Sequence, residues 1–126
     1  MKKSIVICFS LLLVLNSCEV CETNLGDNFS YMKNGIGCDD FGPPTILFGS
    51  GAIYGIGEVT NYVFDENLII FCYQENGVTK NAIINKKTYN DCRGKLPNRG
   101  IIWNSDSKFQ EIIVANFSLA KKLECP

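Results

Sequence analysis

The stretch Leu68-Ile69-Ile70-Phe71-Cys72-Tyr73-Gln74 decides the fold, because its apolar side chains would lie on both faces of any strand that it forms. Its β-branched and aromatic residues favour a strand. A strand that is apolar on both faces belongs in the middle of a sheet with a covering layer on each side. We therefore expect a central strand whose second face is covered by another element.

Two further strands are predicted on either side of this segment. Residues 58–64 precede it and are separated from it by the turn residues Asp65-Glu66-Asn67. Residues 79–85 follow it after Glu75-Asn76-Gly77, whose Asn-Gly pair suits a hairpin turn with two successive positive φ angles. These patterns predict a three-strand antiparallel meander.

The C-terminal segment has the pattern of an amphipathic helix. Ser107 and Gln110 match the capping box that begins a helix. Apolar residues then recur at helical spacing: Phe109, Ile112, Ile113, Phe117, Ala120 and Leu123. We expect this helix to be structural core and to cover the second face of the central strand. The predicted fold is therefore α+β, a small antiparallel β-meander sheet covered by one C-terminal α-helix, with further short strands over residues 29–32 and 45–48.

The N-terminus has the pattern of an export signal. Met1-Lys2-Lys3 is followed by an apolar run over residues 5–15, which is too short to span a bilayer. Leu15-Asn16-Ser17-Cys18 then resembles the lipobox of bacterial lipoproteins. That resemblance implies a signal peptide over residues 1–17, a diacylglycerol on the Cys18 sulfur, and a further acyl chain such as palmitate on the new amino group. We therefore expect the lipid bilayer to be a partner through the acyl chains on Cys18.

The remaining chain divides into a short tether and one domain. Residues 18–27 are predicted to be the lipidated Cys and a polar tether, and residues 28–126 a single globular α+β domain. Acidic Glu19 and Glu22 follow the lipid site, and in some bacterial groups such residues direct a lipoprotein to the outer membrane or cell surface. A solvated linker with incidental charge is the alternative interpretation. The expected location is the cell envelope, at the outer membrane or cell surface if the bacterium is Gram-negative.

Cysteine usage agrees with an oxidising compartment. Once Cys18 is lipidated, five candidate disulfide cysteines remain: Cys21, Cys38, Cys72, Cys92 and Cys125. They allow two disulfides and one odd cysteine, and the sequence does not choose the pairing.

The composition removes several classes of chemistry. The chain contains 0 histidines, so Ser-His and Cys-His nucleophile pairs and imidazole zinc ligands are excluded. The acidic pairs Asp39-Asp40 and Asp65-Glu66 lie in predicted turns, where solvated turn residues are the favoured interpretation. We predict no catalytic residue, no metal site and no cofactor. The formal charge of -1 and the lack of a basic cluster predict no nucleic-acid partner.

Two family resemblances bear on function. Ser50-Gly51-Ala52-Ile53-Tyr54 is similar to a motif of the lipoprotein inhibitors of C-type lysozyme, which implies an inhibitory loop. Those inhibitors end soon after the motif, whereas a long segment follows it here. Residues 25–31, 62–70 and 82–86 together with the late helix resemble the small bacterial lipoproteins grouped as domain of unknown function 3997. That resemblance implies an architecture and adds no site.

Together these patterns predict a membrane-anchored cell-envelope lipoprotein that acts as a non-enzymatic binding or interaction module, with an envelope protein as one candidate partner. A periplasmic lipoprotein similar to the lysozyme inhibitors is one alternative. An envelope enzyme that works without histidine is the other.

Overall fold

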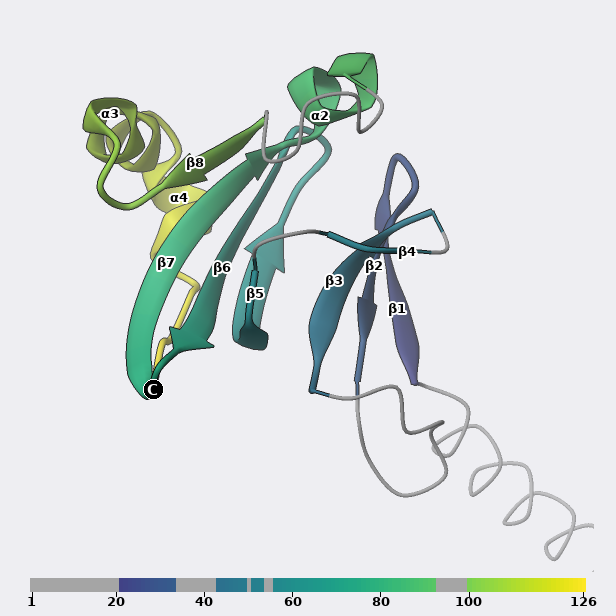
Figure 1. The fold of residues 1–126 in the computed structure, drawn as a ribbon. Helices are drawn as coiled ribbons and strands as arrows, with labels where there is room; N and C mark the ends of the chain where they lie inside the picture. The colour runs from purple at the N-terminus through teal and green to yellow at the C-terminus, as the bar shows by residue number, and fades with distance from the viewer. Residues whose placement is uncertain (1–20, 34–42, 50, 54–55, 93–99) are drawn as a thin grey trace, which may run out of the picture.

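The computed structural model describes residues 21–33, 43–49, 51–53, 56–92 and 100–126, and the prediction for Cys18 lies outside these residues. Eight strands form two four-stranded antiparallel sheets (Figure 1). Sheet A has the order β1(Glu22–Gly26), β2(Phe29–Met32), β3(Thr45–Phe48), β4(Gly51–Ala52). Sheet B has the order β5(Glu58–Phe64), β6(Leu68–Glu75), β7(Val78–Asn85), β8(Ile101–Trp103). With helices α2(Lys86–Cys92), α3(Ser107–Ala115) and α4(Phe117–Ala120), this arrangement confirms the α+β class.

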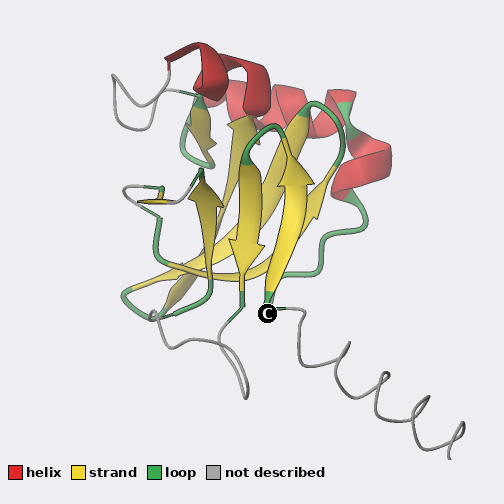
Figure 2. Ribbon diagram, turned by 90° about the vertical axis from the view of Figure 1, so that its right-hand side faces the viewer, coloured by secondary structure: helices red, strands yellow, loops and turns green. Residues whose placement is uncertain are grey.

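The predicted meander forms most of sheet B. Strand β6 pairs with β5 on one side and with β7 on the other. Asn76 and Gly77 adopt φ angles of 53° and 77°, so the β6–β7 hairpin has the turn that the Asn-Gly pair indicates. Strand β8 adds to the free edge of β7 and was not predicted. Figure 2 shows α3 and α4 packed behind the strands and α2 at the top, at one end of the sheets.

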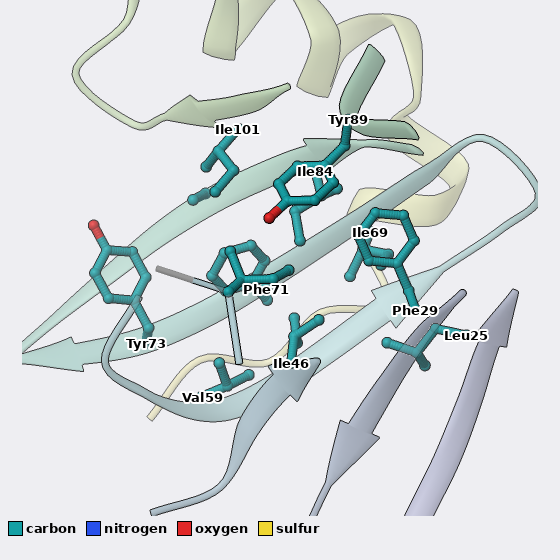
Figure 3. Packing of buried hydrophobic residues seen from close by; sticks show 12 residues of the cluster. Leu25, Phe29, Ile46, Val59, Ile69, Phe71, Tyr73, Ile84, Tyr89 and Ile101 are labelled. Atoms are coloured by element: carbon teal, nitrogen blue, oxygen red, sulfur yellow. The ribbon is translucent and has the colours of Figure 1, made fainter. Parts of the chain in front are cut away.

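Strand β6 is buried on both faces, as its sequence predicts. On its inner face Ile69, Phe71 and Tyr73 join a core that fills the space between the two sheets (Figure 3). Sheet A contributes Leu25 and Phe29 to this inter-sheet core. On the outer face Leu68 and Ile70 join Ile83 in a smaller cluster. The molecule therefore has three layers: sheet A, sheet B and the C-terminal helices.

The prediction of a polar tether over residues 18–27 is wrong for residues 22–26, which form strand β1. Residues 22–26 pair with β2 and belong to the domain. Leu25 is 0% exposed and packs in the inter-sheet core. The turn that closes the hairpin uses Asp27 and Asn28, whose φ angles are 52° and 72°. A single apolar residue among polar ones carries no periodic signal, so only the pairing with β2 reveals this strand.

The predicted C-terminal helix is broken into two parts. Asn116 ends α3, and its side-chain amide donates to the Ile112 carbonyl at 2.9 Å. The helix begins at a different cap from the predicted one, because the Asp106 side chain accepts from the backbone N–H of Lys108 at 2.9 Å. Phe117 is 64% exposed, so the prediction that it belongs to the core is wrong. The break at Asn116 interrupts the helical period and turns Phe117 away from the sheet.

The other apolar residues predicted for the helical face do cover sheet B, whereas Val114 is 67% exposed. The side chains that pack on the outer cluster are Phe109, Ile112, Ile113, Leu119, Ala120 and Leu123. The cover predicted for the second face of β6 is therefore present, in two short helices instead of one.

Helix α2 brings a buried charge between the two sheets. Lys86 is 2% exposed, and its ammonium group donates to the backbone carbonyls of Leu25 and Asp65, the latter at 2.6 Å. Its nitrogen lies 5.4 Å from the centre of the Phe64 ring. The register of β1 shifts between Asn24 and Gly26, which leaves Leu25 without an opposite residue in β2. Lys86 supplies the donor for that carbonyl and connects sheet A to the β5–β6 turn.

Replacement of Lys86 by Met should destabilise the domain. Lys86→Met keeps the length of the side chain and leaves the buried Leu25 carbonyl and the partly buried Asp65 carbonyl without this donor. We expect the free energy of unfolding to fall by about 1–3 kcal/mol. Denaturation in urea measures this change. Lys87→Met is the matched control, since Lys87 is exposed on the same helix, and equal stability of the two variants would contradict the role assigned to Lys86.

The two phenylalanines of the C-terminal segment should differ in their effect on stability. Phe109 is half-buried against sheet B, so Phe109→Ala should lower the free energy of unfolding by about 1–2 kcal/mol. Phe117 is exposed, so Phe117→Ala should change it by less than about 0.5 kcal/mol. Thermal melts of both variants measure the difference. A larger loss for Phe117→Ala would place that side chain in the core after all.

Candidate functional site

A polar depression lies at the end of the domain that carries α2. Its volume is about 540 Å³, within the range of small-molecule sites. We call it the α2 depression, and it is lined by Asp27, Glu66, Asn67, Asn85, Lys87, Asn90 and Asp91. These residues come from the β1–β2 turn, the β5–β6 turn, the end of β7 and helix α2. Segments far apart in the sequence therefore meet at one end of the molecule (Figure 1).

Hydrogen bonds around α2 hold these segments together. The Asn85 side chain accepts from the backbone N–H of Thr88 at 3.0 Å and so begins the helix. The Asn90 amide donates to the Lys86 carbonyl at 2.9 Å and to the Asp27 carbonyl at 3.2 Å. The backbone N–H of Lys86 donates to the Asn67 carbonyl at 3.0 Å. The rim of the depression is thus built on bonds that cross between both sheets and the helix.

The β5–β6 turn is held by its own aspartate. One carboxylate oxygen of Asp65 accepts from the backbone N–H groups of Asn67 and Leu68, each at 2.8 Å. Asp65 therefore has the turn role that the sequence indicated, and its neighbour Glu66 lines the depression. The other acidic pair, Asp39 and Asp40, lies outside the described residues.

The charge of the depression is net negative. Three carboxylate side chains, those of Asp27, Glu66 and Asp91, face one ammonium group, that of Lys87. Carboxylates only accept hydrogen bonds when ionised, whereas amides both donate and accept. Among the described residues there is no group of three or more histidine, cysteine, aspartate or glutamate side chains placed to hold a metal ion. The lining thus suits a ligand rich in hydrogen-bond donors.

Two groups of helix α2 have shifted pKa values. Burial lowers the pKa of Lys86, and the carboxylates of Asp27 and Asp65 act in the opposite direction. Burial raises the pKa of the Tyr89 phenol, whose ring packs on Phe29 and Phe48 with centroid distances of 5.3 and 4.9 Å. Tyr89 packs in the inter-sheet core and Lys86 bonds to carbonyls of β1 and the β5–β6 turn, so both residues fix α2 to the sheets.

The structure places four of the five candidate disulfide cysteines. Cys72 and Cys125 are joined, with their Cα atoms 5.7 Å apart and a sequence separation of 53. Cys21 is also disulfide-bonded. Cys92 is free and half-buried among the described residues, and Cys38 lies outside them.

The segment that resembles the lysozyme inhibitors is only partly described. Gly51 and Ala52 form the short strand β4 at the edge of sheet A. Ile53 is 3% exposed and packs in the inter-sheet core. Ser50 and Tyr54, the two positions with polar side-chain groups, lie outside the described residues.

Sequence reasoning missed both α2 and the depression. Residues 86–92 form two turns of helix and have no long apolar period. The available signal was the density of Asn, Asp and Glu at two predicted turns and after the last predicted strand. Only the fold shows that those turns meet.

No family model, curated protein or solved structure in the three comparisons made with this chain matches it. Within the described residues, the helices are all too short or too polar to cross a membrane.

Proposed function

We propose that this chain is a lipoprotein anchored in the bacterial cell envelope, and that it acts as a non-enzymatic binding module. The observation that carries the proposal is the lipobox at residues 15–18. The absence of histidine from the whole sequence supports a binding role over the catalytic chemistries that depend on imidazole.

The position of the lipid site suits a binding role. Cys18 precedes Cys21 by three residues, which span at most about 11 Å when extended. Strand β1 then runs from Glu22 towards the end of the domain where α2 lies (Figure 1). A lipid on Cys18 would therefore hold the opposite end of the domain near the membrane. The α2 depression would face away from the bilayer, where a ligand reaches it.

The lining of the depression suggests the class of ligand. Its polar side chains disfavour an acyl chain or another apolar molecule. Its excess of carboxylate acceptors favours a molecule with many hydroxyl or amino donors. We propose a sugar that carries amino groups, because such a ligand matches both the hydrogen-bonding capacity and the negative charge.

The resemblances to domain of unknown function 3997 and to the lysozyme inhibitors support different parts of the proposal. The residues that resemble domain of unknown function 3997 include Leu25, Phe29 and Ile69 of the inter-sheet core, so that likeness supports an architecture. The likeness to the lysozyme inhibitors stays a prediction for residues 50–54.

The anchor is tested by replacing the lipidated cysteine. Cys18→Ser removes the sulfur that accepts the lipid, so this variant should remain an uncleaved precursor or appear in the soluble envelope fraction. Fractionation and the mass of the N-terminal peptide measure the outcome. Cys8→Ser is the matched control, since Cys8 belongs to the predicted signal peptide and its loss should leave anchoring unchanged. A Cys18→Ser protein that is processed and membrane-bound like the parent would refute the anchor.

The site is tested with a defined probe. Calorimetric titration of the purified protein with a trisaccharide of glucosamine should show binding, and the N-acetylated trisaccharide should bind more weakly. Joint substitution of Glu66→Gln and Asp91→Asn should weaken binding about tenfold or more, because it removes two charged acceptors. Glu111→Gln, an exposed change on α3, should have no effect. Absence of binding, or an affinity for the glucosamine trisaccharide that the double substitution leaves unchanged, would contradict this ligand class.

A further inference from the structure

The C-terminal segment, residues 107–126, buries fewer side chains against sheet B than the two sheets bury against each other. None of the residues in α3 or α4 is buried. The segment packs on the three buried residues Leu68, Ile70 and Ile83. Among the described residues, the inter-sheet core contains 12 buried residues and none from this segment. Helix α3 has 9 residues, fewer than the roughly 12–15 at which an isolated helix becomes even marginally stable in water.

One row of side chains holds the end of this segment. Cys72 is 0% exposed, lies in the middle of β6 and forms the disulfide with Cys125. Asn61 and Asn81 are its register partners on β5 and β7. The Asn61 amide donates to the Glu124 carbonyl at 2.8 Å, and the Asn81 amide lies 3.5 Å from the Cys125 sulfur. The strongest attachment of the chain end is therefore a covalent bond that sits between two amides.

We propose that residues 107–126 form a redox-sensitive strap, which the Cys72–Cys125 disulfide latches onto the outer face of sheet B. A dithiol reductant would open the latch and release the strap while the two sheets stay folded. The inter-sheet core supports this separation, because none of its described residues belongs to the strap.

The exposure of the two sulfur-bearing residues determines the course of the reduction. Cys125 is exposed, whereas Cys72 is buried in the sheet. A thiolate of the reductant would attack the Cys125 sulfur and form a mixed disulfide with it, and Cys72 would leave as a thiolate that takes a proton. The second thiolate of the reductant would then attack the reductant sulfur that is bonded to Cys125. This step releases Cys125 as a thiolate, which takes a proton. Two electrons pass from the dithiol to the protein, and the reductant becomes a disulfide.

Hydrogen exchange tests the strap in the full-length protein. Cys125→Ala opens the latch without a cavity in the sheet, because Cys72 keeps its side chain. Amides of α3 and α4 should then exchange roughly a hundredfold faster. With the sheets still folded, the disulfide closes only the segment of about twenty residues between the end of β8 and Cys125, and this is the order of effect expected when that closure is lost. Amides of β6 and β7 should keep their protection. Wild-type protein treated with dithiothreitol should show the same pattern in α3 and α4.

The matched control is Cys92→Ala, which removes the free thiol of α2 and leaves the latch intact. It should leave the exchange of α3 and α4 unchanged. Unchanged protection of these helices in Cys125→Ala would show that packing alone holds them, which overturns the latch. Loss of protection throughout both sheets would show that the strap is integral to the fold and would also overturn the proposal. Equal increases in the hydrogen exchange of α3 and α4 in Cys92→Ala and Cys125→Ala would show that the Cys72–Cys125 disulfide has no specific role.

Discussion

The buried ammonium group of Lys86 is the contact on which the arrangement of the two sheets depends. It donates to a carbonyl of β1 and to a carbonyl of the β5–β6 turn, so a single side chain joins sheet A, sheet B and α2. A buried cation is costly without partners. Here the carbonyl oxygens and the face of the Phe64 ring offset that cost. Gly26 is part of the same arrangement, because a Cβ atom at that position would lie 3.1 Å from the Lys86 nitrogen.

The two faces of β6 explain why the layers differ in strength. Its inner face packs against a second sheet, and aromatic rings from both sheets and α2 fill the space between them. In the described part of the chain, its outer face is covered by α3, α4 and Leu123, none of which is fully buried. The disulfide to Cys125 compensates for that weaker packing, because it restricts the chain end in the unfolded ensemble. The same strand is thus held by packing on one side and by packing plus a covalent bond on the other.

The relation between the candidate site and the proposed anchor depends on the direction of β1. The strand carries the chain from the predicted membrane-proximal end to the turn at Asp27, and Asn90 of α2 bonds to the carbonyl of that residue. The polar residues of the depression therefore lie at turns and at the start of α2, where backbone N–H and C=O groups need hydrogen-bond partners. Lys86 is buried beside them. The hydrogen bonds of Asn85 and Asn90 fix part of this rim. A rim that is held in place before a ligand arrives is suited to binding.

The sequence by itself determined the strands of the meander, the Asn76-Gly77 turn and the two-sided burial of β6, because these follow from local propensity and from the alternation of side chains along one strand. It also carries the contiguous residues 15–18, whose resemblance to a lipobox is the basis of the proposed anchor. Only the tertiary structure decided that residues 22–26 form a strand, that Asn116 breaks the helix, and that Lys86 is buried. Each of these depends on partners distant in sequence: β2 for the strand, sheet B for the helices, and the carbonyls of Leu25 and Asp65 for the lysine. The depression belongs to the same group, since turns that look solvated one at a time become a site only when the fold brings them together.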